Sequence, residues 1–168
     1  MDLLEIKVYP AAVLKQRAAP ITNIDDRIRE LAQAMLDTMY RAPGVGLAAP
    51  QVGESIRLLV ADPGSREEPE PIVLVNPQIT AAEGKTAMQE GCLSVPGFTA
   101  EVDRHKRIIV KGWTLDEQEV ELELVDFPAI LLQHEIDHLE GTLFIDRISR
   151  LKRNIYERKR KKGTLPED

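Results

Sequence analysis

The sequence predicts one α+β domain of 168 residues, in which mixed or antiparallel β-sheets pack around a central helix. Two helical patterns and a group of strand-like runs favour this fold. Apolar residues recur with helical spacing from Ile28 to Met39, and a second helical stretch occupies residues 126–140. The other segments are short runs rich in β-branched residues, separated by glycines and prolines. Strands that are grouped together, instead of alternating with helices, are typical of α+β folds.

Composition limits the function classes. The chain has 43% apolar and 30% charged residues, as in an ordinary globular protein, and no stretch approaches the roughly 18–20 apolar residues of a membrane span. Residues 1–7 include acidic and basic side chains where a signal peptide needs an apolar region. A single cysteine excludes an internal disulfide. We therefore expect a cytoplasmic protein without a membrane partner.

Charge is unevenly distributed along the chain. Residues 150–162 contain eight Lys or Arg and one Glu, a local charge of +7. Because the whole chain has a net charge of −6, the remaining residues carry −13. An acidic body does not suit DNA, whereas the basic segment could contact nucleic acid. Ile148, Leu151 and Ile155 give it a thin apolar stripe, so we expect a last helix here and a flexible tail at residues 163–168.

The N-terminal quarter is expected to hold an arm and a helix. Tyr9-Pro10 and Ala19-Pro20 predict an extended arm, and Asp25 is a suitable N-cap for the first helix. Residues 44–51, Gly-Val-Gly-Leu-Ala-Ala-Pro-Gln, either let a backbone approach another group closely or form a tight helix-to-strand turn.

The middle of the chain predicts strands. The strand-like runs are residues 56–61, 72–75, 101–112 and 119–125. Asn76-Pro77 is expected to end the second of them. Cys92 is expected in an irregular loop before the third, where it is either a small hydrophobic residue or a functional thiol.

The helix at residues 126–140 contains His134-Glu135-Ile136-Asp137-His138, and Asp126 is its expected N-cap. Histidines four apart share one helical face, so both imidazoles can bind one metal ion. Glu135 can then act on water bound to that ion. The alternative is a pair of core histidines that are hydrogen-bonded to the backbone.

The third ligand decides the class of metal enzyme. A metzincin would place a third histidine where Phe144 stands, whereas another class of zinc endopeptidase would use a later carboxylate such as Asp146 or Glu157. Cys92 is the better candidate, because a thiolate and two imidazoles leave a fourth position open for water, as catalytic metal sites do.

Three segments together resemble the signature motifs of the peptide deformylase family. They are residues 44–51, Glu90-Gly-Cys-Leu-Ser94 and Gln133-His-Glu-Ile-Asp-His-Leu139. Tyr9-Pro10, Ala19-Pro20 and Arg104 also match, so the resemblance covers residues 3–160. It implies that Cys92, His134 and His138 bind one divalent metal ion, natively Fe²⁺, which Zn²⁺, Ni²⁺ or Co²⁺ can replace. The implied reaction removes formate from the N-formylmethionine of nascent proteins.

The resemblance also implies roles for individual residues. A metal ion lowers the pKa of its water, so hydroxide is available to attack the formyl carbon. Glu135 would take the proton and return it to the departing amine. The Gln51 side-chain amide and the Leu93 backbone N–H would donate to the oxyanion.

The implied substrate site is a peptide-binding edge beside an apolar pocket. The peptide would add as a strand beside Gly44, Val45, Gly46 and the loop at Gly91. The methionine pocket would be lined by Val45, Phe127, Ile130 and Leu131, and Arg104 would help to fix the substrate backbone. The chain departs from the family at Ala11, at Asp126 and at residues 116–118. Family members often carry glycine at the position of Asp126 and in the turn at residues 116–118.

Two further function classes compete with this interpretation. One is a His-Glu-x-x-His zinc endopeptidase, and the other is a non-enzymatic ribosome-associated protein that keeps the fold. The presence of Gln51, Cys92, His134, Glu135 and His138 argues against the second. The basic last helix resembles a family helix that docks on the ribosome, and its alternative is a solvated helix end.

Overall fold

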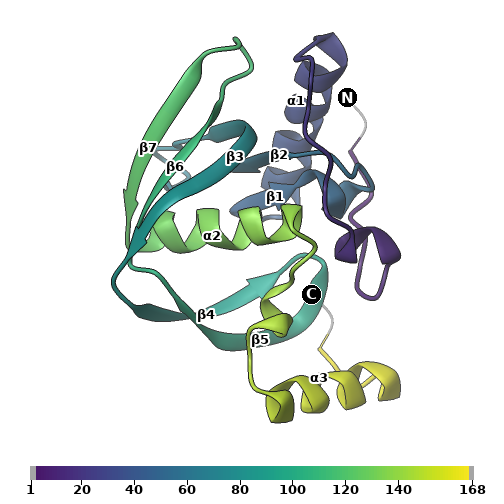
Figure 1. The fold of residues 1–168 in the computed structure, drawn as a ribbon. Helices are drawn as coiled ribbons and strands as arrows, with labels where there is room; N and C mark the ends of the chain where they lie inside the picture. Colours follow the sequence, from purple (N-terminus) through teal and green to yellow (C-terminus); the bar gives the residue numbers. More distant parts are fainter. Residues whose placement is uncertain (1–2, 167–168) are drawn as a thin grey trace.

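The computed structural model describes residues 3–166, which form two antiparallel sheets and three α-helices (Figure 1). The helices are α1 (Asp26–Arg41), α2 (Phe127–Leu139) and α3 (Arg150–Lys162). The strands are β1 (Gly46–Ala48), β2 (Leu58–Ala61), β3 (Ile72–Glu83), β4 (Thr86–Cys92), β5 (Val95–Arg104), β6 (Arg107–Trp113) and β7 (Glu119–Val125). This architecture confirms the α+β prediction.

Helix α2 lies between the two sheets (Figure 1). The larger sheet has the strand order β1-β2-β3-β6-β7, and β4 pairs with β5 in the smaller one. Leu132 and Ile136 of α2 pack in one buried cluster with Leu59, Leu74 and Val110 of the larger sheet. Because most of α2 is apolar and it is covered on several sides, even its polar residues His134, Glu135 and His138 are buried.

Helix α1 and strand β7 follow the sequence patterns closely. The Asp25 carboxylate accepts a hydrogen bond from Ile28 N at 3.1 Å, which confirms the predicted N-cap. Met35 and Met39 are fully buried against β1 and β2. Strand β7 spans the predicted residues 119–125, with its glutamates directed outward.

Two strand boundaries differ from the prediction. Strand β3 does not end at Asn76-Pro77 but continues to Glu83, because register shifts against β6 accommodate the proline and Asn76 adopts a φ of 50°. Residues 101–112 are not one strand either. The chain leaves β5 at Arg104 and enters β6 at Arg107, in the other sheet.

Cys92 does not lie in an irregular loop. It is the last residue of β4, opposite Val95 of β5, where a register shift follows Glu90. The β4–β5 pairing is long, from Thr86 opposite Arg104 to Cys92, and it places the thiol at the tip of a hairpin below α2. The hairpin joins consecutive strands, but the glycine and proline residues near its tip resemble those of a loop in the sequence.

The start of α2 also corrects a prediction. Asp126 precedes the helix with a φ of 61°, and its side chain makes no capping hydrogen bond. A positive φ favours glycine, so Asp126 adopts a backbone conformation that is unfavourable for a residue with a side chain. Glu117, in the turn between β6 and β7, likewise has a φ of 60°.

Both chain ends pack differently from the predictions. The N-terminal arm is interrupted by a 3-10 turn at Ala12–Lys15, preceded by a cis peptide bond at Tyr9-Pro10. Helix α3 is held by Tyr156, which is 1% exposed, whereas Leu151 of the predicted apolar stripe is 67% exposed. Of the predicted flexible tail, Leu165 packs on the body, and Glu167 and Asp168 lie outside the described residues.

The described residues include no helix of sufficient length and apolar character to cross a membrane.

Candidate active site

Strand β4 and helix α2 bring one thiol and two imidazoles together. The candidate ligand atoms of Cys92, His134 and His138 all lie within 4.8 Å of one another. Cys92 Sγ lies 3.4 Å from Nε2 of His138, and the two imidazole rings are 5.0 Å apart between centroids. The helical spacing of four residues thus does what the sequence predicted, because it directs both rings to the same side of α2.

A buried carboxylate orients His134. Oε1 of Glu90 lies 2.9 Å from His134 Nδ1, so the hydrogen bond leaves Nε2 directed toward the centre of the cluster. The Arg104 guanidinium in turn donates to both oxygens of Glu90, each at 2.8 Å. The burial of this pair is nearly complete, with side chains 3% and 6% exposed.

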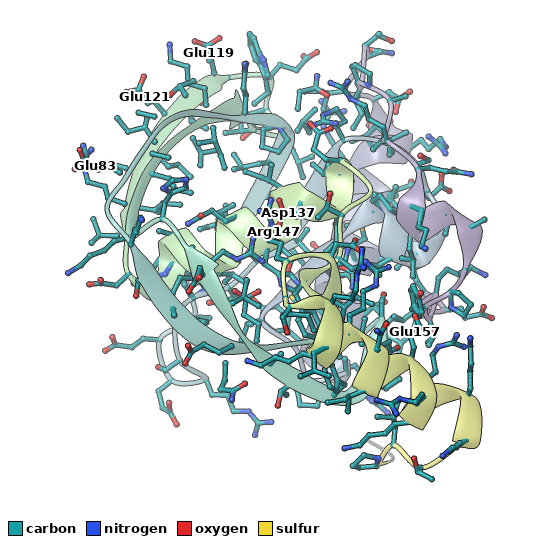
Figure 2. The ribbon with its side chains drawn as sticks, turned by 60° about the horizontal axis from the view of Figure 1, so that its bottom comes forward. Glu83, Glu119, Glu121, Asp137, Arg147 and Glu157 are labelled. Atoms are coloured by element: carbon teal, nitrogen blue, oxygen red, sulfur yellow. The ribbon has the colours of Figure 1, made fainter. Side chains whose placement is uncertain are left out.

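The same network extends to the surface. Arg104 Nη1 donates to Asp137 at 2.6 Å, and Asp137 also accepts from Arg147 Nη2 at 2.7 Å. Figure 2 shows Asp137 and Arg147 side by side. The guanidinium of Arg104 is therefore committed to two carboxylates and does not line the cavity described below, contrary to its expected contact with the substrate backbone.

Electrostatics favour a cation between the three side chains. Burial lowers the pKa of His138 well below its usual value, and the charges of His134 and Arg104 lower it further, so this imidazole is neutral and able to bind a metal. At His134 burial also opposes a charge, but hydrogen bonds to Cys92 and Glu90 and the charge of Glu135 outweigh it and raise the pKa. The negative groups beside His134 thus stabilise positive charge on its ring, while His138 supplies a neutral donor.

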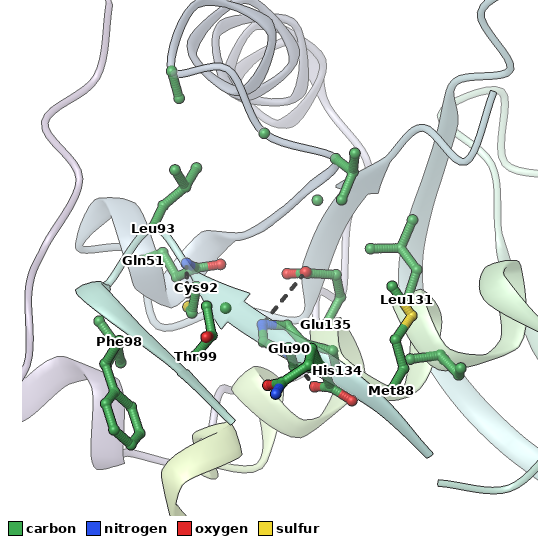
Figure 3. Close-up of a pocket in the computed structure, with 18 of the residues that line it drawn as sticks. Gln51, Met88, Glu90, Cys92, Leu93, Phe98, Thr99, Leu131, His134 and Glu135 are labelled. Carbon is green, nitrogen blue, oxygen red and sulfur yellow. Dashed lines mark hydrogen bonds and ion pairs between the residues drawn. The ribbon is translucent and has the colours of Figure 1, made fainter. Parts of the chain in front are cut away.

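Glu135 is a buried carboxylate beside this cluster. Its Oε2 lies 3.9 Å from His134 Nε2, and Oε1 has no hydrogen-bond partner among the described residues (Figure 3). Burial raises the pKa of Glu135 to about 7. A Cβ atom on Gly46 would lie 2.4 Å from Oε2, so the glycine of β1 leaves the room that this carboxylate occupies.

Gln51 approaches the cluster beside Cys92. Its carbonyl oxygen accepts from Ala48 N at 2.9 Å, which fixes the amide orientation. The Nε2 atom then points at Cys92 Sγ, 3.5 Å away, and at Ser94 Oγ, 3.1 Å away. An N–H donor is therefore held beside the thiol inside the cavity, where it can stabilise a negatively charged oxygen.

These residues share one cavity of 670 Å³, large enough for a peptide fragment. It brings together Gly44, Val45, Gly46, Gln51, Gly91, Cys92, Leu93, Phe127, Ile130, Leu131, His134 and Glu135, all of which the sequence singled out. His138 lies behind them, against Cys92. Val45, at 47% exposed, is at the rim.

Sequence reasoning missed several residues of the site. Glu90 lies in the same motif as Cys92, but the register shift between them means that strand alternation alone does not predict its orientation toward His134. Met88, Phe98, Thr99 and Pro166 also line the cavity. No local pattern distinguishes them, because the pairing of β5 and the return of the C-terminus bring them there.

None of the other positions considered for a third metal ligand supplies a donor atom to the cluster of Cys92, His134 and His138. Phe144 is 1% exposed and stacks on His134 with ring centroids 6.2 Å apart. Asp146 caps a 3-10 turn through Leu143 N and pairs with Arg153. Glu157 binds Tyr9 and Arg160. In the described residues, Cys92 is thus the third donor that meets the two histidines.

Comparison with known proteins decides the family. The family model described as polypeptide deformylase matches residues 3–154. The chain belongs to the polypeptide deformylase family. It is 48% identical over 163 residues to the peptide deformylase of Syntrophobacter fumaroxidans, covering 96% of both chains. It is 50% identical over 160 residues to that of Thermodesulfovibrio yellowstonii, covering 95% of this chain and 97% of the other.

Solved structures of deformylases share the fold. A peptide deformylase from Legionella pneumophila superposes with a TM-score of 0.90 at 40% identity, covering 98% of this chain and 100% of the other. One from Ehrlichia chaffeensis in complex with actinonin gives a TM-score of 0.90 at 36% identity, covering 97% and 98%. The family consists of enzymes, which excludes the non-enzymatic interpretation, and the endopeptidase alternative finds no support in these relatives.

Proposed function

We propose that this deformylase removes the formyl group from N-formylmethionine at the N-terminus of nascent proteins and releases formate. The observation that carries the proposal is the convergence of a Cys-His-His donor set, a buried carboxylate and an amide donor in one cavity. Membership in the polypeptide deformylase family supports the substrate class.

Cys92, His134 and His138 would hold one divalent metal ion. The fit rests on the neutral His138 ring, on the Glu90 hydrogen bond that frees His134 Nε2, and on the environment that favours positive charge. A thiolate with two imidazoles suits Fe²⁺ as the native ion, and Zn²⁺, Ni²⁺ or Co²⁺ can occupy the same donors. When bound, the ion lowers the pKa of a water molecule and polarises the formyl carbonyl.

Glu135 would move the proton. Its carboxylate faces the cavity from α2 with one unpartnered oxygen, and burial holds its pKa near neutrality. A carboxylate in this state can accept a proton from the attacking water and return it to the amine that leaves. The proton then stays within a few ångströms of the reacting atoms and is not exchanged with bulk solvent.

Gln51 and Leu93 would stabilise the oxyanion. The Gln51 amide is 1% exposed and is oriented before substrate binds, because Ala48 N holds its carbonyl oxygen. The backbone N–H of Leu93 follows Cys92 on the same wall of the cavity. Donors fixed in advance lose little free energy on reorganisation when charge develops on the oxygen.

The apolar end of the cavity would select methionine. Phe127, Ile130 and Leu131 of α2, with Val45 at the rim, line this end, and Met88 of β4 completes it. The peptide would bind as a strand along Gly44, Val45 and Gly46 on one side and Gly91 on the other. Main-chain hydrogen bonds to a strand are independent of side chains, so many nascent sequences could bind.

Glu135→Ala tests the reaction. Anaerobically purified protein should release formate from formyl-Met peptides, and the variant should lose about 10²–10⁴-fold in kcat because it lacks the proton acceptor. Glu101→Ala, at an exposed site on β5, is the matched control and should retain full activity. Full activity of Glu135→Ala would refute the mechanism. Cleavage of internal bonds, with formyl peptides left intact, would refute the function.

The basic helix α3 would contact the ribosome. Six of its cations are not paired in the ion pairs of the described residues, namely Arg150, Lys152, Arg158, Lys159, Lys161 and Lys162. Such a face suits rRNA phosphate, and binding should weaken steeply as salt rises. Replacing Lys159, Lys161 and Lys162 by Glu should abolish co-sedimentation with ribosomes. Unchanged co-sedimentation would refute this contact.

Action on nascent chains would place the protein in the cytoplasm.

A further inference from the structure

The chain returns to the cavity after its last helix. Gly163 ends α3 with a φ of 68°, and its N–H donates to Arg160 O at 3.2 Å. Thr164 N then donates to Lys159 O at 3.0 Å, which is how a left-handed glycine reverses a chain at a helix end. Figure 1 shows the chain turning from α3 back toward β4 and β5. Residues 164–166 are called the C-terminal segment below.

The C-terminal segment is attached to the wall of the cavity. Leu165, half-buried, packs against the cluster that contains Tyr156, Phe144 and Phe98. The Phe98 ring lies 4.8 Å from that of Tyr156 and 6.2 Å from that of Phe144, between centroids. Helix α3 therefore supports the first residues of β5 from behind and carries the segment to them.

Pro166 lies directly over Gly97. A Cβ atom on Gly97 would lie 2.2 Å from Pro166 O and 3.2 Å from its N and C, so glycine is required for this approach. Both residues line the cavity that contains Cys92 and Glu135. Because 670 Å³ remains open, Pro166 bounds the cavity and does not fill it.

The cavity has two ends on either side of the reacting groups. Figure 3 shows Met88 and Leu131 on one side of Cys92 and Glu135, and Leu93 and Phe98 on the other. The proposed function places the methionine side chain at the first end. The residues that follow methionine then have the second end available, where Gly97, Phe98, Thr99 and Pro166 form the wall.

We propose that the C-terminal segment is the outer wall of a subsite for the substrate residues that follow formyl-methionine, and that it raises affinity for longer peptides. This inference rests on the proposed function. The segment contacts peptide atoms remote from the formyl group, so its contribution is uniform binding, which appears in KM and not in kcat. We expect a formyl dipeptide to be too short to reach it.

Truncation tests the subsite. A chain that ends after Gly163 is compared with a control that ends after Pro166, on formyl-Met-Ala and on a formyl hexapeptide with the same first two residues. For the hexapeptide we expect kcat/KM to fall about fivefold through KM, with less than about a twofold change for the dipeptide. Leu165→Asp, which keeps the full length but disfavours the packed position, should reproduce the result.

A double-mutant cycle tests the contact itself. Gly97→Ala in the full chain introduces both strain, since φ is 75°, and a clash with Pro166, whereas in the truncated chain only the strain remains. The loss for the hexapeptide should therefore be larger in the full chain, and additive effects would refute the contact. Melting temperatures of all variants report any loss of folding.

Three outcomes would refute the proposed subsite. An unchanged hexapeptide rate, an equal loss for both peptides, or faster hydrolysis by the truncated chain would each refute it; the last would mean that the segment obstructs the cavity. Absence of formate release from both peptides by the full chain would instead refute the proposed function, which keeps the two failures distinct.

Discussion

Nδ1 of His134 lies 2.9 Å from Oε1 of Glu90, and both oxygens of Glu90 are held by Arg104. This contact occupies Nδ1 of the histidine on α2 and directs its Nε2 into the cluster with Cys92 and His138. A residue of the smaller sheet thus decides how a residue of the central helix can bind a metal ion.

Glu90→Gln should weaken metal binding without removing a ligand. The amide oxygen can still accept from His134, but Arg104 loses one of its two charged partners in a buried site and keeps only Asp137. We expect metal affinity to fall about 10–100-fold. Stability should fall by about 3–5 kcal/mol, as when a buried ion pair is broken. Chelator competition and urea unfolding measure the two effects, with Glu101→Gln as the control. Unaltered affinity would show that Glu90 does not position His134.

Cys92→Ala should lose metal and activity together. It removes the donor that lies 3.4 Å from Nε2 of His138, and no other thiol exists in the chain. Metal content per chain and formate release measure the outcome. Thr99→Ala, at the rim of the same cavity, should keep its metal. Retention of both metal and activity by Cys92→Ala would point to a different third ligand.

Gly46→Ala should lower activity while metal content stays unchanged. The new methyl group would lie 2.4 Å from Glu135 Oε2 and force the carboxylate out of position. We expect kcat to fall about 100-fold, because well-placed acid–base groups contribute 10²–10⁴-fold. Gly112→Ala is a control in β6, where the added atom would meet Val75 O at 3.3 Å, and Leu74 Cδ2 and Pro77 Cα at 3.4 Å, none of them in the cavity. Normal kcat in Gly46→Ala would mean that Glu135 acts from another position.

Asp62→Asn should destabilise the protein at neutral pH and not in acid. Burial of Asp62 opposes its charge, but hydrogen bonds from Tyr40 Oη and from the N–H groups of Glu70 and Gly64 outweigh this and lower its pKa. A depressed folded pKa gives stability that is present above the usual pKa and is lost as pH falls through the folded value. The variant should therefore lose about 1–2 kcal/mol near pH 7.

The difference between Asp62→Asn and the natural protein should shrink as the pH falls through the lowered pKa of Asp62 in the folded state. Urea unfolding at several pH values measures it, and Tyr40→Phe, which removes one of the three donors, should lose less. A difference that is constant with pH would show that the ionised carboxylate is not the source of the stability.

Local patterns were sufficient where structure depends on neighbours in the chain. Asp25 and the apolar spacing after it define α1, alternation defines β7, and the four-residue spacing of His134 and His138 places both rings on one face of α2. Composition contributed the third ligand, since Cys92 is the one cysteine of the chain. These features depend on helix and strand periodicity, which is a property of sequence alone.

Tertiary structure decided which distant groups meet. The contact of Glu90 with His134, the passage from one sheet to the other after Arg104, and the placing of Pro166 over Gly97 join segments that no local pattern relates. Arg104 shows the difference most clearly. A basic residue on a strand is compatible with solvent, substrate or a buried carboxylate, and only packing against Glu90 and Asp137 selected the third. The sequence determined the ligands of the candidate metal centre, and the fold determined what holds them and what surrounds the substrate.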